Sequence, residues 1–136
     1  MTTHPVLRMV DAVTVPVPDL DQGIEFYSGR LGHKLLWRND DRGQAGLGLP
    51  DSKTELVLST GLGYAPNWLV TSVDEAVVTI VAAGGAVLSE PTQIPVGRLG
   101  VVSDPFGNAL VLLDLSAGSY TTDDAGRVIG VVPPAG

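Results

Sequence analysis

A pattern of one strand, one helix and three further strands occurs twice along the chain, and this repeat constrains the fold more than any other feature. An offset of 53 residues aligns the copies, so that Val17 coincides with Val70 and Asp21 with Asp74. Five further matches keep the apolar face of the helix, the glycine that ends it and the next strand's core residue: Leu20 with Val73, Ile24 with Val77, Tyr27 with Ile80, Gly32 with Gly85 and Leu35 with Leu88. Because the matched positions share structural roles, the repeat predicts two equivalent modules.

The helix of each module is predicted from its cap and its apolar spacing. In the first, Asp19 or Asp21 is placed to accept the unpaired amides of the first turn, and the apolar residues follow at helical intervals. Gly32 ends this helix. In the second, Asp74 is the predicted cap, and Gly84-Gly85 ends the helix.

A hairpin is predicted over Arg98–Leu115. Two apolar runs flank Asp104-Pro105-Phe106-Gly107-Asn108, whose residue types favour turn dihedral angles. The second run is apolar on both faces, as expected for a strand that is covered on both sides. The preceding Pro91–Pro95 segment is predicted to be a loop, because proline removes amide donors.

We expect a single domain over residues 1–136. Module one covers about residues 9–60, module two about residues 66–115, and a C-terminal tail covers residues 116–136. Residues 60–66 are predicted to link the modules, with a new strand starting at Trp68. The tail is predicted to form an added hairpin with strands near residues 120–122 and 128–132, and no function is assigned to it.

Composition excludes several functions. The 15 acidic and 8 basic residues give a net charge of −7, which disfavours binding to nucleic acid. With no cysteine there is neither a disulfide framework nor thiolate chemistry. No apolar run is long enough to cross a membrane and no signal peptide precedes the first strand, so we expect no membrane partner and a cytoplasmic location. The acidic balance either favours a cationic ligand or serves solubility alone.

The motifs resemble those of the vicinal oxygen chelate superfamily, which includes glyoxalases, bleomycin resistance proteins and extradiol dioxygenases. The resemblance rests on Val17-Pro18-Asp19-Leu20-Asp21, Phe26-Tyr27, Leu31-Gly32 and the Asp104–Asn108 turn, and covers about residues 9–115. It implies an α+β fold, in which two tandem βαβββ modules form a curved mixed sheet around a central pocket. It also implies a homodimer, since relatives commonly pair.

The enzymes of that superfamily hold a divalent metal with His, Glu or Gln on the first and last strands of each module. Aligned on the motifs, the four positions here are Ala12, Leu58, Ala65 and Val111, whose carbon side chains cannot coordinate a cation. His4 and His33 are predicted to be surface residues. We therefore expect no metal and no other cofactor. An atypical metal set including Glu55 and Asn67 is the alternative.

Aromatic residues are the main candidates for ligand binding. Trp37 ends one predicted strand, Trp68 begins another and Tyr64 lies in the predicted linker. Aromatic planes at these places could hold a flat molecule, although either tryptophan could instead fill the core. Asn67 and Arg98 complete the predicted ligand-binding set. Arg98 could meet an anionic or carbonyl group, or be a solvated cation.

Three functions remain open from the sequence. The first is a metal-free protein that binds and sequesters a small molecule, such as a flat or cationic drug or an aromatic metabolite, without chemistry. No catalytic residues are predicted for it, because neither a Ser/His/Asp set nor a Cys/His pair can be assembled. The second is a metal-dependent lyase, isomerase or dioxygenase. The third is an interaction module whose pocket is vestigial.

Overall fold

The computed structural model describes residues 4–135, which divide into two compact units. The module-one unit comprises residues 11–66 and 120–130, and the module-two unit comprises residues 4–10, 67–119 and 131–135. In each unit a helix packs on one face of four strands. The predicted α+β class with two βαβββ modules is confirmed. The central pocket that the resemblance implied stays a prediction.

Module one has the strand order β2-β3-β4-β1, in which β1 is parallel to β4 and the other neighbours are antiparallel. Asp19 caps the helix, since its carboxylate accepts a hydrogen bond from the amide of Gln22 at 2.8 Å. The helix continues as a π-helix, η1, to Arg30. The elements are β1 (Met9–Pro16), α1 (Leu20–Ile24), η1 (Glu25–Arg30), β2 (Leu35–Asn39), η2 (Asp40–Arg42), β3 (Gln44–Leu49) and β4 (Ser52–Ser59).

The core of module one forms between the helix and one face of its sheet. Leu20 of α1 packs against Ala45, Leu47 and Leu58 of β3 and β4. Gly23 allows the close approach, because a Cβ there would lie 2.9 Å from Cγ1 of Val17. In a strand, alternate residues point to opposite faces, so the neighbours of these core residues lie on the face away from the helix.

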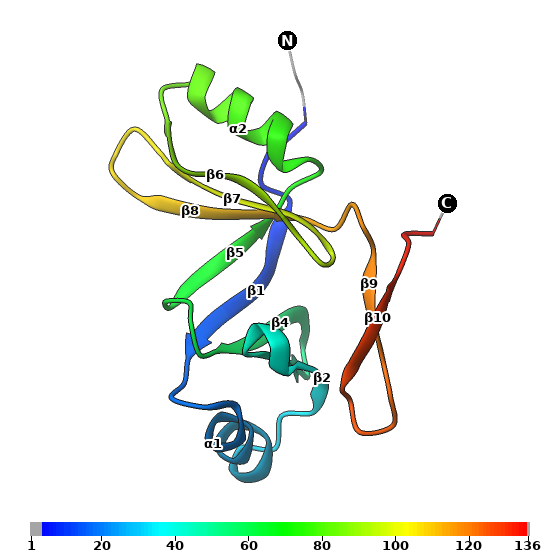
Figure 1. Cartoon of the computed structure of the whole chain (residues 1–136). Helices are drawn as coiled ribbons and strands as arrows, with labels where there is room; N and C mark the ends of the chain where they lie inside the picture. The colour runs from blue at the N-terminus through cyan, green and yellow to red at the C-terminus, as the bar shows by residue number, and fades with distance from the viewer. Residues whose placement is uncertain (1–3, 136) are drawn as a thin grey trace. The chain divides into compact units, whose positions relative to one another are not determined.

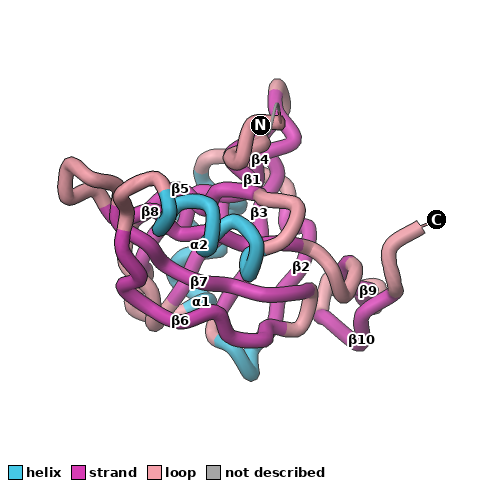
Figure 2. The backbone as a smooth tube through the Cα atoms, turned by 90° about the horizontal axis from the view of Figure 1, so that it is seen from above, coloured by secondary structure: helices cyan, strands magenta, loops and turns pink. Residues whose placement is uncertain are grey.

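Module two repeats this plan with the strand order β5-β8-β7-β6. Val73 and Val77 of its helix pack on Val102 and Leu112 of the sheet. Figure 2 shows α2 lying across the strands of its own module. The elements are β5 (Ala65–Leu69), α2 (Val73–Ala82), β6 (Ala86–Ile94), β7 (Gly97–Ser103) and β8 (Ala109–Asp114).

Three boundaries in module two differ from the sequence predictions. The cap of α2 is Ser72, whose hydroxyl accepts a hydrogen bond from the amide of Glu75, and the predicted cap Asp74 lies inside the first turn. Strand β5 begins at Ala65, within the predicted linker. Strand β6 runs through Pro91 to Ile94, because its pairing with β7 shifts register around Pro91 and a bulged edge strand tolerates proline.

The predicted hairpin between β7 and β8 is confirmed. The Asp104 carboxylate accepts hydrogen bonds from the amides of Phe106 and Asn108 at 2.8 and 2.9 Å. Gly107 has a φ of 89°, which favours glycine. Hydrogen bonds from Asn108 and the turn amides lower the pKa of Asp104, so the carboxylate that shapes the turn is stabilised in its charged form.

Asp114 joins three parts of module two. Its buried carboxylate accepts hydrogen bonds from the amides of Val73 at 2.8 Å and Arg98 at 3.1 Å, and from the hydroxyl of Ser116 at 2.7 Å. Burial acts to raise the pKa of Asp114, but the hydrogen bonds outweigh it and leave that pKa lowered. The charged carboxylate therefore connects the start of α2, the start of β7 and the end of β8.

The predicted C-terminal hairpin is also confirmed, as β9 (Ser119–Thr122) and β10 (Val128–Val132). Residues 120–130 belong to the module-one unit, where the hairpin lies beside β2 (Figure 1). The Gly126 carbonyl accepts a hydrogen bond from the Arg38 amide at 2.8 Å, and Arg38 and Arg127 form an isolated β-bridge. The tail therefore covers part of the β2 edge. No helix among residues 4–135 is long and apolar enough to cross a membrane.

Replacing Asp114 with Asn tests this connection. In the variant, an NH₂ group replaces a carboxylate oxygen that accepts a hydrogen bond from a backbone amide, so two donors face each other. We therefore expect the free energy of unfolding at pH 7, measured by urea titration, to fall by about 2–3 kcal/mol. Because the pKa of Asp114 is lower in the folded than in the unfolded protein, its charged carboxylate stabilises the fold at pH values above the unfolded-state pKa. This stabilisation is lost as the pH falls through the pKa of the folded state. The difference between wild type and Asp114→Asn should therefore shrink on acidification from pH 7 to about pH 3.

The matched control is Asp124→Asn, in the exposed turn of the C-terminal hairpin. It should change the free energy of unfolding by less than about 0.5 kcal/mol. Equal losses in the two variants at pH 7 would contradict the assigned role of Asp114.

Candidate functional site

A bulge in β2 turns Trp37 onto the face of module one that is opposite the helix. Leu35 pairs with Leu47 and packs in the helix-side core, but the register then shifts and Trp37 pairs with Gly46. Gly46 lies between the core residues Ala45 and Leu47, so it points to the opposite face. The one-residue shift therefore places the indole on the same face as Gly46.

Gly46 provides the space that the indole occupies. A Cβ at this position would overlap Nε1 of Trp37 and lie 2.8 Å from Oε1 of Glu55. Gly48, two residues further along β3, differs: the nearest atoms to a Cβ there would be those of Leu36, at an ordinary 3.7 Å. The absence of a side chain at Gly46 is thus a condition for the position of Trp37.

Glu55 lies beneath the indole on β4. The Trp37 Nε1–H donates a hydrogen bond to Oε1 of Glu55 at 2.7 Å. Burial raises the pKa of Glu55, the bond from Trp37 acts to lower it, and the charge of Asp11 raises it further. Burial also raises the pKa of Asp11. Two carboxyl groups that favour their neutral forms more than usual therefore lie near each other in module one.

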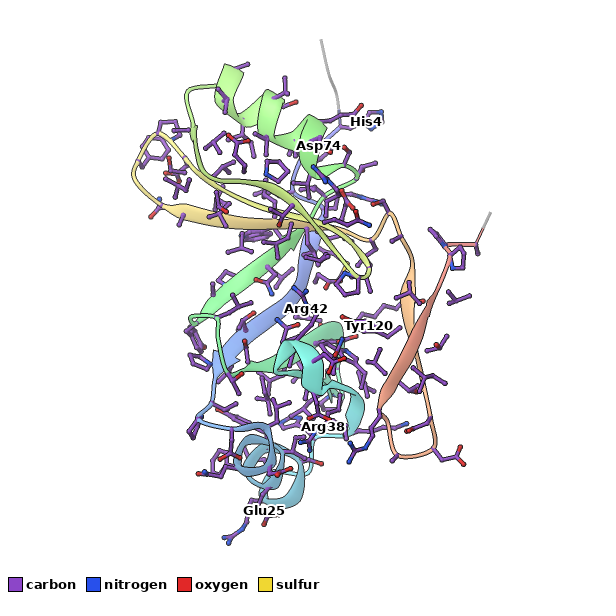
Figure 3. The ribbon with its side chains drawn as sticks, viewed as in Figure 1. His4, Glu25, Arg38, Arg42, Asp74 and Tyr120 are labelled. Atoms are coloured by element: carbon purple, nitrogen blue, oxygen red, sulfur yellow. The ribbon has the colours of Figure 1, made fainter. Side chains whose placement is uncertain are left out.

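The C-terminal hairpin holds the other side of Trp37. The ring centroids of Trp37 and Tyr120 are 4.9 Å apart with an interplanar angle of 48°. The Tyr120 hydroxyl also accepts a hydrogen bond from the Asn39 side chain at 3.5 Å. Figure 3 labels Tyr120 on this hairpin, and Arg38, which pairs with Asp21 at 2.9 Å and Asp40 at 2.8 Å. The tail, to which the sequence assigned no role, thus fixes the indole between Glu55 and Tyr120.

An open cleft of about 560 Å³ lies over the ends of β2, β3 and β4, and Glu55 is one of the residues that line it. This volume lies within the range of small-molecule sites, roughly 300–1,000 Å³. Its lining includes four apolar side chains, two lysines, a histidine and one carboxylate. These residues are Leu31, Leu36, Leu49, Pro50, Lys34, Lys53, His33 and Glu55, with Gly32, Gly48, Ser52 and Thr54 between them.

A second hollow, of about 570 Å³, lies in the same unit near the start of α1. It is lined mainly by polar groups that already bind one another, among them Arg38 with Asp40 and Asp21. These carboxylates raise the pKa of Arg38 further, through their hydrogen bonds and charge. The first cleft, with more apolar surface, is therefore the stronger candidate site.

The predicted ligand-binding residues fall in different places. Trp37 lies beside the cleft, and Tyr64 is 73% exposed in the segment before β5.

Trp68 packs against the helix-side core of module two, a position that favours a structural role. Asn67 pairs with Val111 between β5 and β8. Arg98 forms a bidentate ion pair with Asp74, at 3.0 and 3.2 Å, and its side chain remains 35% exposed. Ligand binding by these residues stays a prediction.

Apart from Glu55, which belonged to the alternative metal set, none of the residues that line the cleft was predicted to form a site. His33 was expected on the surface, but it is half-buried, with Nδ1 3.1 Å from the carbonyl oxygen of Gly48. Lys34, Leu36 and Lys53 were not singled out. One sequence pattern could have indicated the cleft: the two lysines of the chain lie at the starts of the strands before and after the glycine-rich segment that forms β3.

The superfamily's usual metal site does not fit these residues. Ala12 and Val111 have no donor atom, and Leu58 packs in the helix-side core. Within residues 4–135, no group of three His, Cys, Asp or Glu side chains is arranged to hold a metal ion. Glu55, the carboxylate nearest to Leu58 in the sequence, already accepts the indole hydrogen bond. We therefore derive no chemistry through a bound metal.

Comparison with known proteins identifies the family. The family model of the Glyoxalase/Bleomycin resistance protein/Dioxygenase superfamily matches residues 9–112. The chain belongs to this superfamily, as its motifs suggested. No curated protein sequence matches it significantly.

Solved structures with the same fold include several methylmalonyl-CoA epimerases. The enzyme from Mycobacterium tuberculosis is 24% identical with a TM-score of 0.66, covering 84% of this chain and 92% of that chain. A Streptomyces coelicolor epimerase in complex with 2-nitronate-propionyl-CoA is 23% identical with a TM-score of 0.64, covering 82% and 96%. The hypothetical protein BH1468 from Bacillus halodurans is 19% identical with a TM-score of 0.61, covering 78% and 93%. At these identities the likeness is one of fold.

Alanine at Gly46 and at Gly48 provides a matched test of the site's construction. Gly46→Ala displaces the indole from Glu55 and Tyr120, so the free energy of unfolding should fall by about 2–3 kcal/mol and the near-ultraviolet circular dichroism of the aromatic rings should change. Gly48→Ala adds an ordinary contact with Leu36 and should change the free energy of unfolding by less than about 1 kcal/mol. Equal effects of the two variants would show that Gly46 has no special role.

Proposed function

We propose that this protein binds a small organic molecule in the cleft of module one, without a metal ion and without converting it. The observation that carries the proposal is the cleft itself, whose volume of about 560 Å³ and apolar side chains suit a small, flat ligand. The superfamily includes proteins that bind small molecules, and the poor donor set supports a metal-free site. A drug or an aromatic metabolite fits this description.

The indole of Trp37 supports the cleft rather than forming its floor. It donates its hydrogen to Glu55, which lines the cleft, and its ring contacts Tyr120. A ligand in the cleft would therefore change the environment of Trp37 through Glu55. Leu36, which the bulge places over Gly48, offers the apolar contact. The predicted homodimer remains part of the proposal.

The metal-dependent alternative, a lyase, isomerase or dioxygenase that uses Glu55 and Asn67, has one observation in its favour. The raised pKa of Glu55 is a property that acid–base catalysts use. Buried structural carboxylates show the same property, and the hydrogen bond from Trp37 accounts for the position of Glu55. Metal analysis of protein purified without a tag separates the alternatives.

The neutral dye N-phenyl-1-naphthylamine tests the proposed function. We expect saturable binding, measured by dye fluorescence, that EDTA leaves unchanged. Leu36→Ala removes an apolar contact and should weaken binding roughly threefold to tenfold. Leu62→Ala, at an exposed position outside the cleft, is the matched control and should bind as wild type does. Stoichiometric zinc, nickel, manganese or iron in the protein, or equal binding by both variants, would contradict the proposal.

A further inference from the structure

We propose that the ligand of the cleft is an organic anion, whose carboxylate, sulfonate or phosphate group is held by Lys34 and Lys53 while its apolar body contacts Leu36 and Leu49. This inference rests on the proposed function and adds the chemical class of the ligand. It differs from the cationic ligand that was one of the two explanations offered for the acidic composition.

The two lysines lie in or directly before strands that flank the same central strand of module one. The chain has two lysines, and both line this cleft. Lys34 directly precedes β2 and Lys53 lies in β4, with β3 between these strands. The Lys34 carbonyl accepts a hydrogen bond from the Gly48 amide at 2.8 Å, and Leu49 pairs with Ser52. Two strand spacings amount to roughly 10 Å, so two long flexible side chains can converge on one group between them.

Within the part of the chain that the structure describes, no carboxylate is paired with either lysine. Among residues 4–135, neither Lys34 nor Lys53 forms an ion pair, whereas Arg30, Arg38, Arg98 and Arg127 each bind a carboxylate. The influences on the pKa of Glu55 are burial, Trp37 and Asp11, and they include no lysine. The two ammonium groups therefore keep their hydrogen-bonding capacity for a ligand.

The net charge of the whole chain is negative, unlike the local charge of the cleft. At a net charge of −7, the long-range field repels anions, so an anion can bind only where cations are locally concentrated. The cleft is such a place, with two lysines against one lining carboxylate.

A pair of dyes tests the inference. The probe 8-anilinonaphthalene-1-sulfonate has the ring system of N-phenyl-1-naphthylamine and adds one sulfonate. Wild type should bind the sulfonate dye about fivefold more tightly than the neutral dye, and high salt should reduce this preference. The double variant Lys34→Gln/Lys53→Gln should lose the preference while its affinity for the neutral dye is unchanged.

Two controls separate charge from folding. Arg42→Gln removes one exposed positive charge outside the cleft and should keep the preference. Lys34→Arg/Lys53→Arg keeps both charges and should also keep it. Near-ultraviolet circular dichroism reports whether each variant retains its packing. Equal affinity of wild type for the two dyes, or an unchanged preference in Lys34→Gln/Lys53→Gln, overturns the inference and leaves the proposed function intact. Failure of both dyes to bind overturns both.

Discussion

The hydrogen bond from the Trp37 indole to Glu55 is the interaction on which the candidate site depends. It joins β2 to β4 across β3, and it is possible because Gly46 has no side chain in the path of the ring. Tyr120 contacts the same indole from the C-terminal hairpin. One aromatic side chain thus connects three strands of module one to a segment more than eighty residues later in the chain. The carboxylate that accepts the indole hydrogen bond is one of the groups that line the cleft.

Each module has a similar core between its helix and its sheet, but the sheet faces that point away from the helices carry different residues. Thr14 pairs with Val57, and its repeat counterpart Asn67 pairs with Val111. These pairs match Val57 with Val111, so Glu55, two residues before Val57, corresponds to Ala109. Trp37 corresponds to Glu90 at the 53-residue offset of the repeat, and Glu90 is exposed. The indole–carboxylate pair therefore exists in one module only. Each module therefore has its own helix-side core, and the indole–carboxylate pair lies on the face where the two modules differ.

The sequence predicted those parts of the fold that depend on short-range patterns. Apolar spacing, glycine stops and the Asp104–Asn108 turn act within a few residues, and the helices and hairpins that they predict are present. The cap of α2 was misplaced because Ser72 and Asp74 are both suitable cap residues two positions apart. The loop expected at Pro91–Pro95 was wrong because proline is compatible with a bulged edge strand.

The site was harder to predict because it depends on contacts between distant residues. A bulge after Leu35 is invisible in a short apolar run, yet it decides which face Trp37 occupies. Lys34 and Lys53 line the same cleft because β2 and β4 flank the same strand. Trp68 resembled Trp37 in the sequence, but it packs against the helix-side core of its own module. The net charge of the chain left open whether its acidic residues favour a cationic ligand or serve solubility alone, and it gave no sign that both lysines line one cleft.

Nuclear magnetic resonance of the two indole groups tests the central claim, that the ligand site is the module-one cleft supported by Trp37 and Glu55. The chain has two tryptophans, so two Nε1–H signals are expected, and a Trp37→Phe variant assigns them. During titration with 8-anilinonaphthalene-1-sulfonate, the account predicts that the Trp37 signal moves, because its acceptor Glu55 lines the cleft, while the Trp68 signal stays in place. Movement of the Trp68 signal with an unchanged Trp37 signal would contradict it.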